Sequence, residues 1–131
     1  MLYDREVVLD TLLQIRESID HIVEWNGDVI SGDSYRCSPD GMKTLAATCM
    51  LLEAIGEGVK KIDKWTDRSL LRAVCPDIEW KNIMGMRDHI AHGYFDIDAD
   101  FVLDVVCNDL LVLKGAVETL ISYIKNIDAP L

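Results

Sequence analysis

The chain is organised around residues 76–98, which read Pro76-Asp-Ile-Glu-Trp-Lys-Asn-Ile-Met-Gly-Met-Arg-Asp-His-Ile-Ala-His-Gly-Tyr-Phe-Asp-Ile-Asp98. We expect a helix from Glu79 or Trp80 to about Ala91. Gly93 comes just after it, and glycine is the residue that most often takes the left-handed position past a helix end. The stretch is therefore predicted to be a helix followed by a sharp turn.

Helical periodicity predicts the frame around this stretch. Apolar residues recur at spacings of three and four, which places one apolar stripe along each expected helix. Turn-forming residues over 27–38 instead predict an irregular loop. The other expected helices cover residues 4–25, 39–62, 66–74 and 99–126. The predicted fold class is all-α, an antiparallel four-helix bundle with an additional short helix, in one domain over residues 1–131.

Local signals set several of these boundaries. Ser38 before Pro39 is an N-cap with proline at the first helical position, and Asp98 is expected to cap the last helix at its positive end. Gly56 and Gly58 lie inside the expected helix 39–62, where each destabilises it by about 1 kcal/mol relative to alanine. Two explanations remain open for these glycines, a close helix crossing and a local kink.

The charge balance excludes broad classes of partner. The chain has 13 basic and 23 acidic side chains and a net charge of −10. A general binder of nucleic acid or of membrane surfaces needs a basic footprint, which this composition lacks. We find neither a membrane-spanning apolar run nor a signal peptide, so we expect a cytoplasmic protein without membrane contact. The cysteines form no Cys-x-x-Cys pair, so neither a zinc site nor a redox motif is indicated. We expect no metal site and no cofactor.

One segment departs from the acidic balance. Between residues 60 and 72, five basic side chains stand against the two carboxylates of Asp63 and Asp67. We call the five basic residues the basic strip: Lys60, Lys61, Lys64, Arg68 and Arg72. It is either a solvated helix face or a surface for RNA phosphates, and the sequence leaves both interpretations open.

The string Arg-x-x-x-x-His-x-Tyr, formed by Arg87, His92 and Tyr94, carries the candidate chemistry. On a continuous helix Arg87 and His92 would point about 140° apart, so the turn at Gly93 is needed to bring the side chains together. Arginine binds two phosphate oxygens at once, histidine exchanges a proton near neutral pH, and tyrosine supplies a hydroxyl. The string predicts a phosphate site; the alternative is a histidine that caps a helix end beside a surface arginine.

This stretch resembles the signature of the HEPN superfamily, most closely its HepT-like branch. The matching positions are Ile78, Trp80, Gly85, Arg87, His92, Tyr94, Ile97 and Asp98. Residues 52–57, Leu-Glu-Ala-Ile-Gly-Glu, also resemble the second-helix signature of the family, so the similarity covers most of the chain. Asp88 departs from the pattern, because asparagine is commoner at that position in the branch.

The resemblance implies a metal-independent endoribonuclease that works as a homodimer, with the arginine–histidine pairs of two protomers facing one cleft. Arg87 would stabilise charge on the phosphate, and His92 would act as general base or acid. Asp88 would orient His92, and Gly93 would shape the turn. In this branch the enzyme is a toxin, and a nucleotidyltransferase antitoxin silences it by attaching adenosine monophosphate to the tyrosine, here Tyr94.

A second interpretation from another class remains open. It is a catalytically silent HEPN dimer that serves as a scaffold or target for a nucleotidyltransferase. The net charge of −10 and the carboxylate of Asp88 favour it, because both repel RNA outside the basic strip. Trp80 likewise has two interpretations, a core edge and a platform on which a base stacks.

Overall fold

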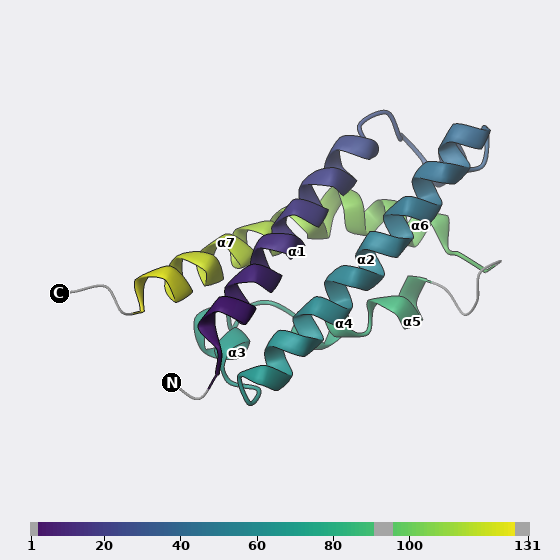
Figure 1. Cartoon of the computed structure of the whole chain (residues 1–131). Coiled ribbons are helices and arrows are strands. Elements are labelled where there is room, and N and C mark those ends of the chain that lie inside the picture. The colour runs from purple at the N-terminus through teal and green to yellow at the C-terminus, as the bar shows by residue number, and fades with distance from the viewer. Residues whose placement is uncertain (1–2, 91–95, 128–131) are drawn as a thin grey trace.

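The computed structural model describes residues 3–90 and 96–127 of the chain. Within these residues the all-α class is confirmed, because every element there is a helix (Figure 1). The long helices are α1 (Arg5–Trp25), α2 (Pro39–Trp65) and α7 (Leu110–Asn126). The short ones are η1 (Gly32–Tyr35), α3 (Leu70–Val74), α4 (Trp80–Met84), α5 (Met86–Ile90), α6 (Ala99–Asp104) and η2 (Val105–Asp109).

The long helices form where the apolar stripes are longest. The side chains that α1 buries are those of the predicted stripe: Val8, Leu12, Ile15, Ile19 and Ile22. α1 packs against both α2 and α7. The segments α6, η2 and α7 follow one another without a break, as predicted, although η2 is a turn of π-helix. Asp98 caps this run, accepting a hydrogen bond from the amide of Phe101 at 3.0 Å.

The segment expected to be an irregular loop, residues 27–38, is packed instead. It contains η1, whose Tyr35 is completely buried and donates a hydrogen bond to Oδ1 of Asn26 at 2.6 Å. The amide group of Asn26 in turn donates to Oγ1 of Thr48 on α2 at 2.9 Å. Burial raises the pKa of Tyr35 to about 12. Turn-forming residues alone do not reveal this network, because its partners lie on other helices.

The helix expected over residues 66–74 begins later than predicted. α2 continues to Trp65, and its end is closed by Thr66, whose amide donates to the carbonyl of Ile62 at 3.0 Å. Asp67 and Arg68 then adopt left-handed backbone conformations, with φ of 53° and 60°. Such conformations end a helix, so only residues 70–74 form α3.

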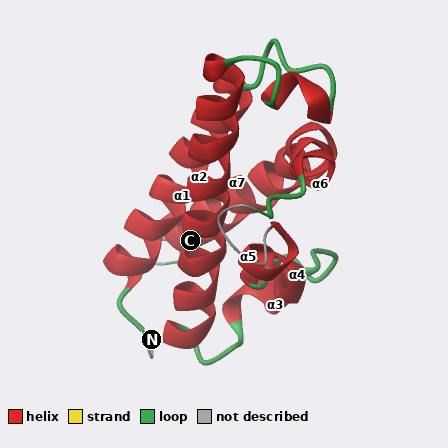
Figure 2. Cartoon of the chain, turned by 90° about the vertical axis from the view of Figure 1, so that its right-hand side faces the viewer, coloured by secondary structure: helices red, strands yellow, loops and turns green. Residues whose placement is uncertain are grey.

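The helix expected from about residue 79 or 80 to Ala91 is divided into α4 and α5 at Gly85. Both short helices contact α2, and Figure 2 shows them beside the long helices together with α3 and α6. A Cβ atom on Gly56 would lie 2.7 Å from the carbonyl oxygen of Ile83. Gly56 therefore permits a close crossing, while α2 runs unbroken through it. No described helix has the length and apolar character needed to cross a bilayer.

Candidate functional site

Helix α5 presents Arg87 to solvent. Met86 and Ile90 anchor α5 in the core, whereas Arg87, Asp88 and His89 are exposed. Among the described residues, Arg87 and the carboxylate of Asp88 have no hydrogen-bond or ion-pair partner. An unpaired guanidinium on an anchored helix is a suitable donor for a phosphate, since its planar fork binds two oxygens.

The two flanks of the His-x-Tyr segment are fixed. The amide of Asp98 donates to the carbonyl of Ile90 at 3.0 Å, which joins the start of α6 to the end of α5. Nη2 of Arg36 donates to the carbonyl of Ile97 at 2.8 Å. His92, Gly93 and Tyr94 lie outside the described residues, so their convergence with Arg87 stays a prediction. Nothing in the sequence pattern singled out Arg36, because its contact partner is 61 positions away.

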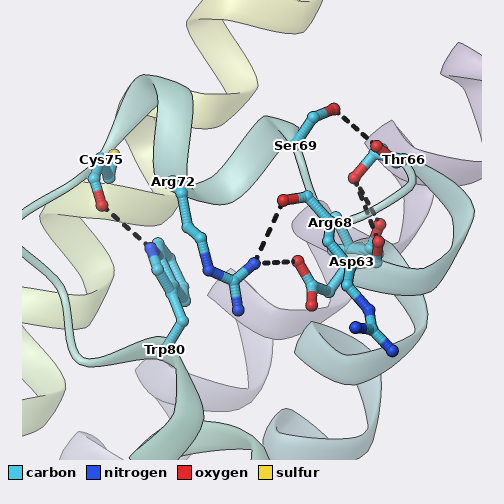
Figure 3. A network of polar contacts seen from close by, with 8 residues as sticks. Asp63, Thr66, Arg68, Ser69, Arg72, Cys75 and Trp80 are labelled. Carbon is cyan, nitrogen blue, oxygen red and sulfur yellow. Dashed lines mark hydrogen bonds and ion pairs between the residues drawn. The ribbon is translucent and has the colours of Figure 1, made fainter.

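The basic strip divides into two parts. Lys60, Lys61, Lys64 and Arg68 have exposed side chains without polar partners in the described part of the chain. Arg72 differs, because its Nη1 lies 2.7 Å from Oδ1 of Asp63 and 3.3 Å from the carbonyl oxygen of Arg68 (Figure 3). The Asp63 side chain is only 10% exposed. Arg72 therefore neutralises a nearly buried carboxylate and holds the α2–α3 connection.

The strip begins near α5 and runs away from it. A Cβ atom on Gly56 would lie 3.5 Å from Cβ of Met86 on α5. Lys60 lies four residues further along α2, a rise of about 6 Å. The rest of the strip follows the last turns of α2 towards α3, away from α5 (Figure 1). Lys60 is therefore the residue of the basic strip that lies nearest along α2 to the contact with α5.

The alternative role of Trp80 has a structural answer. Trp80 is 3% exposed, and its Nε1 donates to the carbonyl of Cys75 at 2.9 Å (Figure 3). The interpretation of Trp80 as a stacking platform for a base is therefore wrong, because its ring is in the core. His89 packs its ring against Phe101, with centroids 6.0 Å apart. The described residues contain no cluster of three His, Cys, Asp or Glu side chains suited to a metal ion.

The chain matches the family model described as ribonuclease HepT-like over residues 8–120. A relative from Thermococcus cleftensis, named "Probable ribonuclease HepT", is 33% identical over 111 residues, which cover 85% of this chain and 93% of the relative. A relative from Methanocaldococcus jannaschii with a provisional RNase name is 28% identical over 127 residues, 97% of this chain and 89% of the relative. No solved structure gave a significant match. These matches confirm the enzyme class expected from the sequence, an endoribonuclease, and the chain belongs to the HepT-like ribonuclease family.

Proposed function

We propose that this protein is the RNA-cleaving toxin of a toxin–antitoxin pair and that Arg87 and His92 carry the cleavage. The observation that carries the proposal is Arg87 itself: an exposed guanidinium without a polar partner in the described structure, on a helix that Met86 and Ile90 anchor in the core. The family membership supports the same reaction.

The proposed reaction is an internal transfer of the RNA phosphate. The ribose 2′-oxygen forms a bond to the adjacent phosphorus while the bond from phosphorus to the 5′-oxygen breaks. His92 takes the proton of the 2′-hydroxyl or returns one to the 5′-oxygen, and Arg87 stabilises the charge on the phosphate oxygens. The products are a 2′,3′-cyclic phosphate and a 5′-hydroxyl, so neither a metal ion nor a cofactor has to take part.

Asp88 and Gly93 have supporting roles in this proposal. Asp88 lies four positions before His92, the spacing at which helical side chains are neighbours, and its carboxylate would orient the imidazole. Gly93 would allow the turn that brings His92 and Tyr94 back towards Arg87. Lys60, Lys61, Lys64 and Arg68 would contact the RNA backbone beyond the cleaved phosphate. Arg72 contributes less to RNA binding, because Asp63 already holds its guanidinium.

We further propose that the active form is a homodimer of HEPN-type bundles in the cytoplasm. In each bundle α1, α2 and the run α6–η2–α7 would be three helices, the broken pair α4–α5 the fourth, and α3 the additional short helix. Two copies of the Arg87 site would then face one cleft. The partner would be a nucleotidyltransferase antitoxin that attaches adenosine monophosphate to Tyr94, because an anionic adduct beside Arg87 would occupy the phosphate site.

The test of the cleavage is incubation of the purified chain with RNA in excess chelator, beside a His92→Ala variant. Lys81→Ala is the matched control, because Lys81 is an exposed cation on α4 outside the proposed site. Cleavage by the wild type and by the control, but not by His92→Ala, is the expected result. Equal loss of RNA with wild type and His92→Ala, or no loss with either, would sink the ribonuclease mechanism.

Assembly and silencing have separate readouts. We expect the wild-type chain to sediment as a dimer at micromolar concentration; a strict monomer would contradict the two-protomer cleft. Co-expression with a nucleotidyltransferase from the neighbouring reading frame should add the mass of adenosine monophosphate to the tryptic peptide that contains Tyr94. A Tyr94→Phe variant should remain unmodified and stay active in the presence of that partner.

The second candidate function is the catalytically silent HEPN scaffold, and the acidic surface favours it. The net charge is −10, and Asp88 is exposed directly after Arg87. A silent scaffold would still sediment as a dimer and still be modified at Tyr94. It would leave RNA intact in every arm of the chelator experiment, which separates it from the toxin.

A further inference from the structure

An apolar groove lies on the other side of α5 from Arg87. It has a volume of about 400 Å³ and runs between α4–α5 on one side and α6, η2 and α7 on the other. Its apolar lining includes Ile78, Ile83, Met86, Phe101, Val105 and Leu113. Val112 also lines it and is 61% exposed, so the apolar surface of the groove continues out to solvent.

The groove is bordered by acidic side chains. Asp77, Glu79 and Asp109 line it, and none of the residues that line it is lysine or arginine. Burial, and then the neighbouring carboxylate of Asp104, raise the pKa of Asp109. An apolar surface with a single sign of charge around it selects a partner with the opposite charge, because unpaired carboxylates resist desolvation.

A turn of π-helix forms one wall of this groove. Val105 and Asp109, the first and last residues of η2, both line it. Such turns are rare inside α-helices and occur frequently at functional sites. Through this turn, one wall of the groove carries both the apolar side chain of Val105 and the acidic side chain of Asp109.

We propose that this groove is the docking site for a basic amphipathic helix of a second protein. The apolar face of such a helix would cover the lining residues, while its lysines and arginines would pair with Asp77, Glu79 and Asp109. Another copy of this chain is the less suitable occupant. It carries the same net charge of −10, and a contact between its basic strip and this groove would join two different surfaces head-to-tail instead of forming a two-fold symmetric dimer.

Docking in the groove would leave the Arg87 surface open. Arg87 and His89 project about 160° apart around α5, and His89 is the one of the two that lines the groove. The proposal therefore stands whether or not the chain cleaves RNA.

The test uses a synthetic helical peptide of leucine and lysine, with one leucine stripe flanked by lysines, labelled for fluorescence anisotropy with the full chain. The comparison probes are a scrambled peptide of the same composition and a leucine–glutamate peptide with the same stripe. Val112→Gln changes an exposed residue of the groove. Leu111→Gln is the matched control, because Leu111 is equally exposed, at 61%, but does not line the groove.

We expect the leucine–lysine peptide to bind better than both comparison probes. Val112→Gln should weaken it about tenfold, the loss expected when one apolar anchor is removed, and Leu111→Gln should not. Reversing the charge of Asp77 and Glu79 to lysine should transfer the preference to the leucine–glutamate peptide. Equal binding of all probes, or equal losses for both glutamine variants, would overturn the proposal. Self-association of the chain that is lost only in Val112→Gln would assign the groove to a second copy and overturn it too.

Discussion

Replacement of Gly56 by alanine tests the close crossing that supports α5. A Cβ atom there would lie 2.7 Å from the carbonyl oxygen of Ile83. This neighbour is backbone, so no side-chain rotation relieves the contact, and such overpacking costs about 1–3 kcal/mol. The same change at Gly115 of α7 meets nothing within 4 Å, so there the helix should gain about 1 kcal/mol from the better propensity of alanine.

The comparison of the two variants removes the propensity gain, which both share. Gly56→Ala should therefore be less stable than Gly115→Ala by about 1–3 kcal/mol, the overpacking term alone. For a chain of this length, 1 kcal/mol corresponds to about 4 °C in melting temperature. The assay is urea and thermal unfolding followed by circular dichroism. If Gly56→Ala is as stable as Gly115→Ala, the reasoning about the crossing is wrong.

Three further predictions concern other parts of the structure. Tyr35→Phe should destabilise the fold by about 1–3 kcal/mol, because Oδ1 of Asn26 loses its buried donor. Burial raises the pKa of Tyr35 in the folded state from 10.0 to about 12, so the wild type keeps its stability below pH 10 and loses stability as the pH rises from 10 to 12. The free energy of unfolding, measured as a function of pH, should show this decline for the wild type and not for Tyr35→Phe. Arg72→Ala should destabilise by about 1–2 kcal/mol in chemical unfolding, because Asp63 keeps a nearly buried charge; an unchanged midpoint would refute the structural role. Arg36→Ala should lower RNA cleavage about tenfold at nearly constant stability, by releasing the end of the segment that bears the candidate site; unchanged cleavage would show that this contact does not position it.

Long periodic segments could be predicted from sequence because their apolar stripes need only one partner surface. The stripe from Val8 to Ile22 defined α1, and the run from 99 to 126 was predicted as one helix. Predictions failed where the outcome depends on distant contacts. Tyr35 looked like a loop residue because Asn26 and Thr48 are not visible as its partners in a linear pattern.

The candidate site shows the same division. The motif identified Arg87 from local spacing, and the structure describes it as exposed on an anchored helix. The basic strip was predicted from charge alone, which cannot separate the partnerless Lys60 from Arg72, whose guanidinium is held by Asp63. The contact of Arg36 and the apolar groove beside α5 depend on how helices meet, so neither has a signature in the sequence.

The most direct test of the central claim is the rate of RNA cleavage by Arg87→Ala relative to wild type, in excess chelator. Because the Arg87 side chain is exposed and makes no polar contact in the described structure, the variant should unfold within about 0.5 kcal/mol of wild type. The account predicts that wild type cleaves RNA under these conditions and that Arg87→Ala is slower by about 10²–10³-fold, the loss typical of a group that stabilises transition-state charge. Equal rates for the two proteins, or wild-type cleavage that stops when metal is removed, would contradict it.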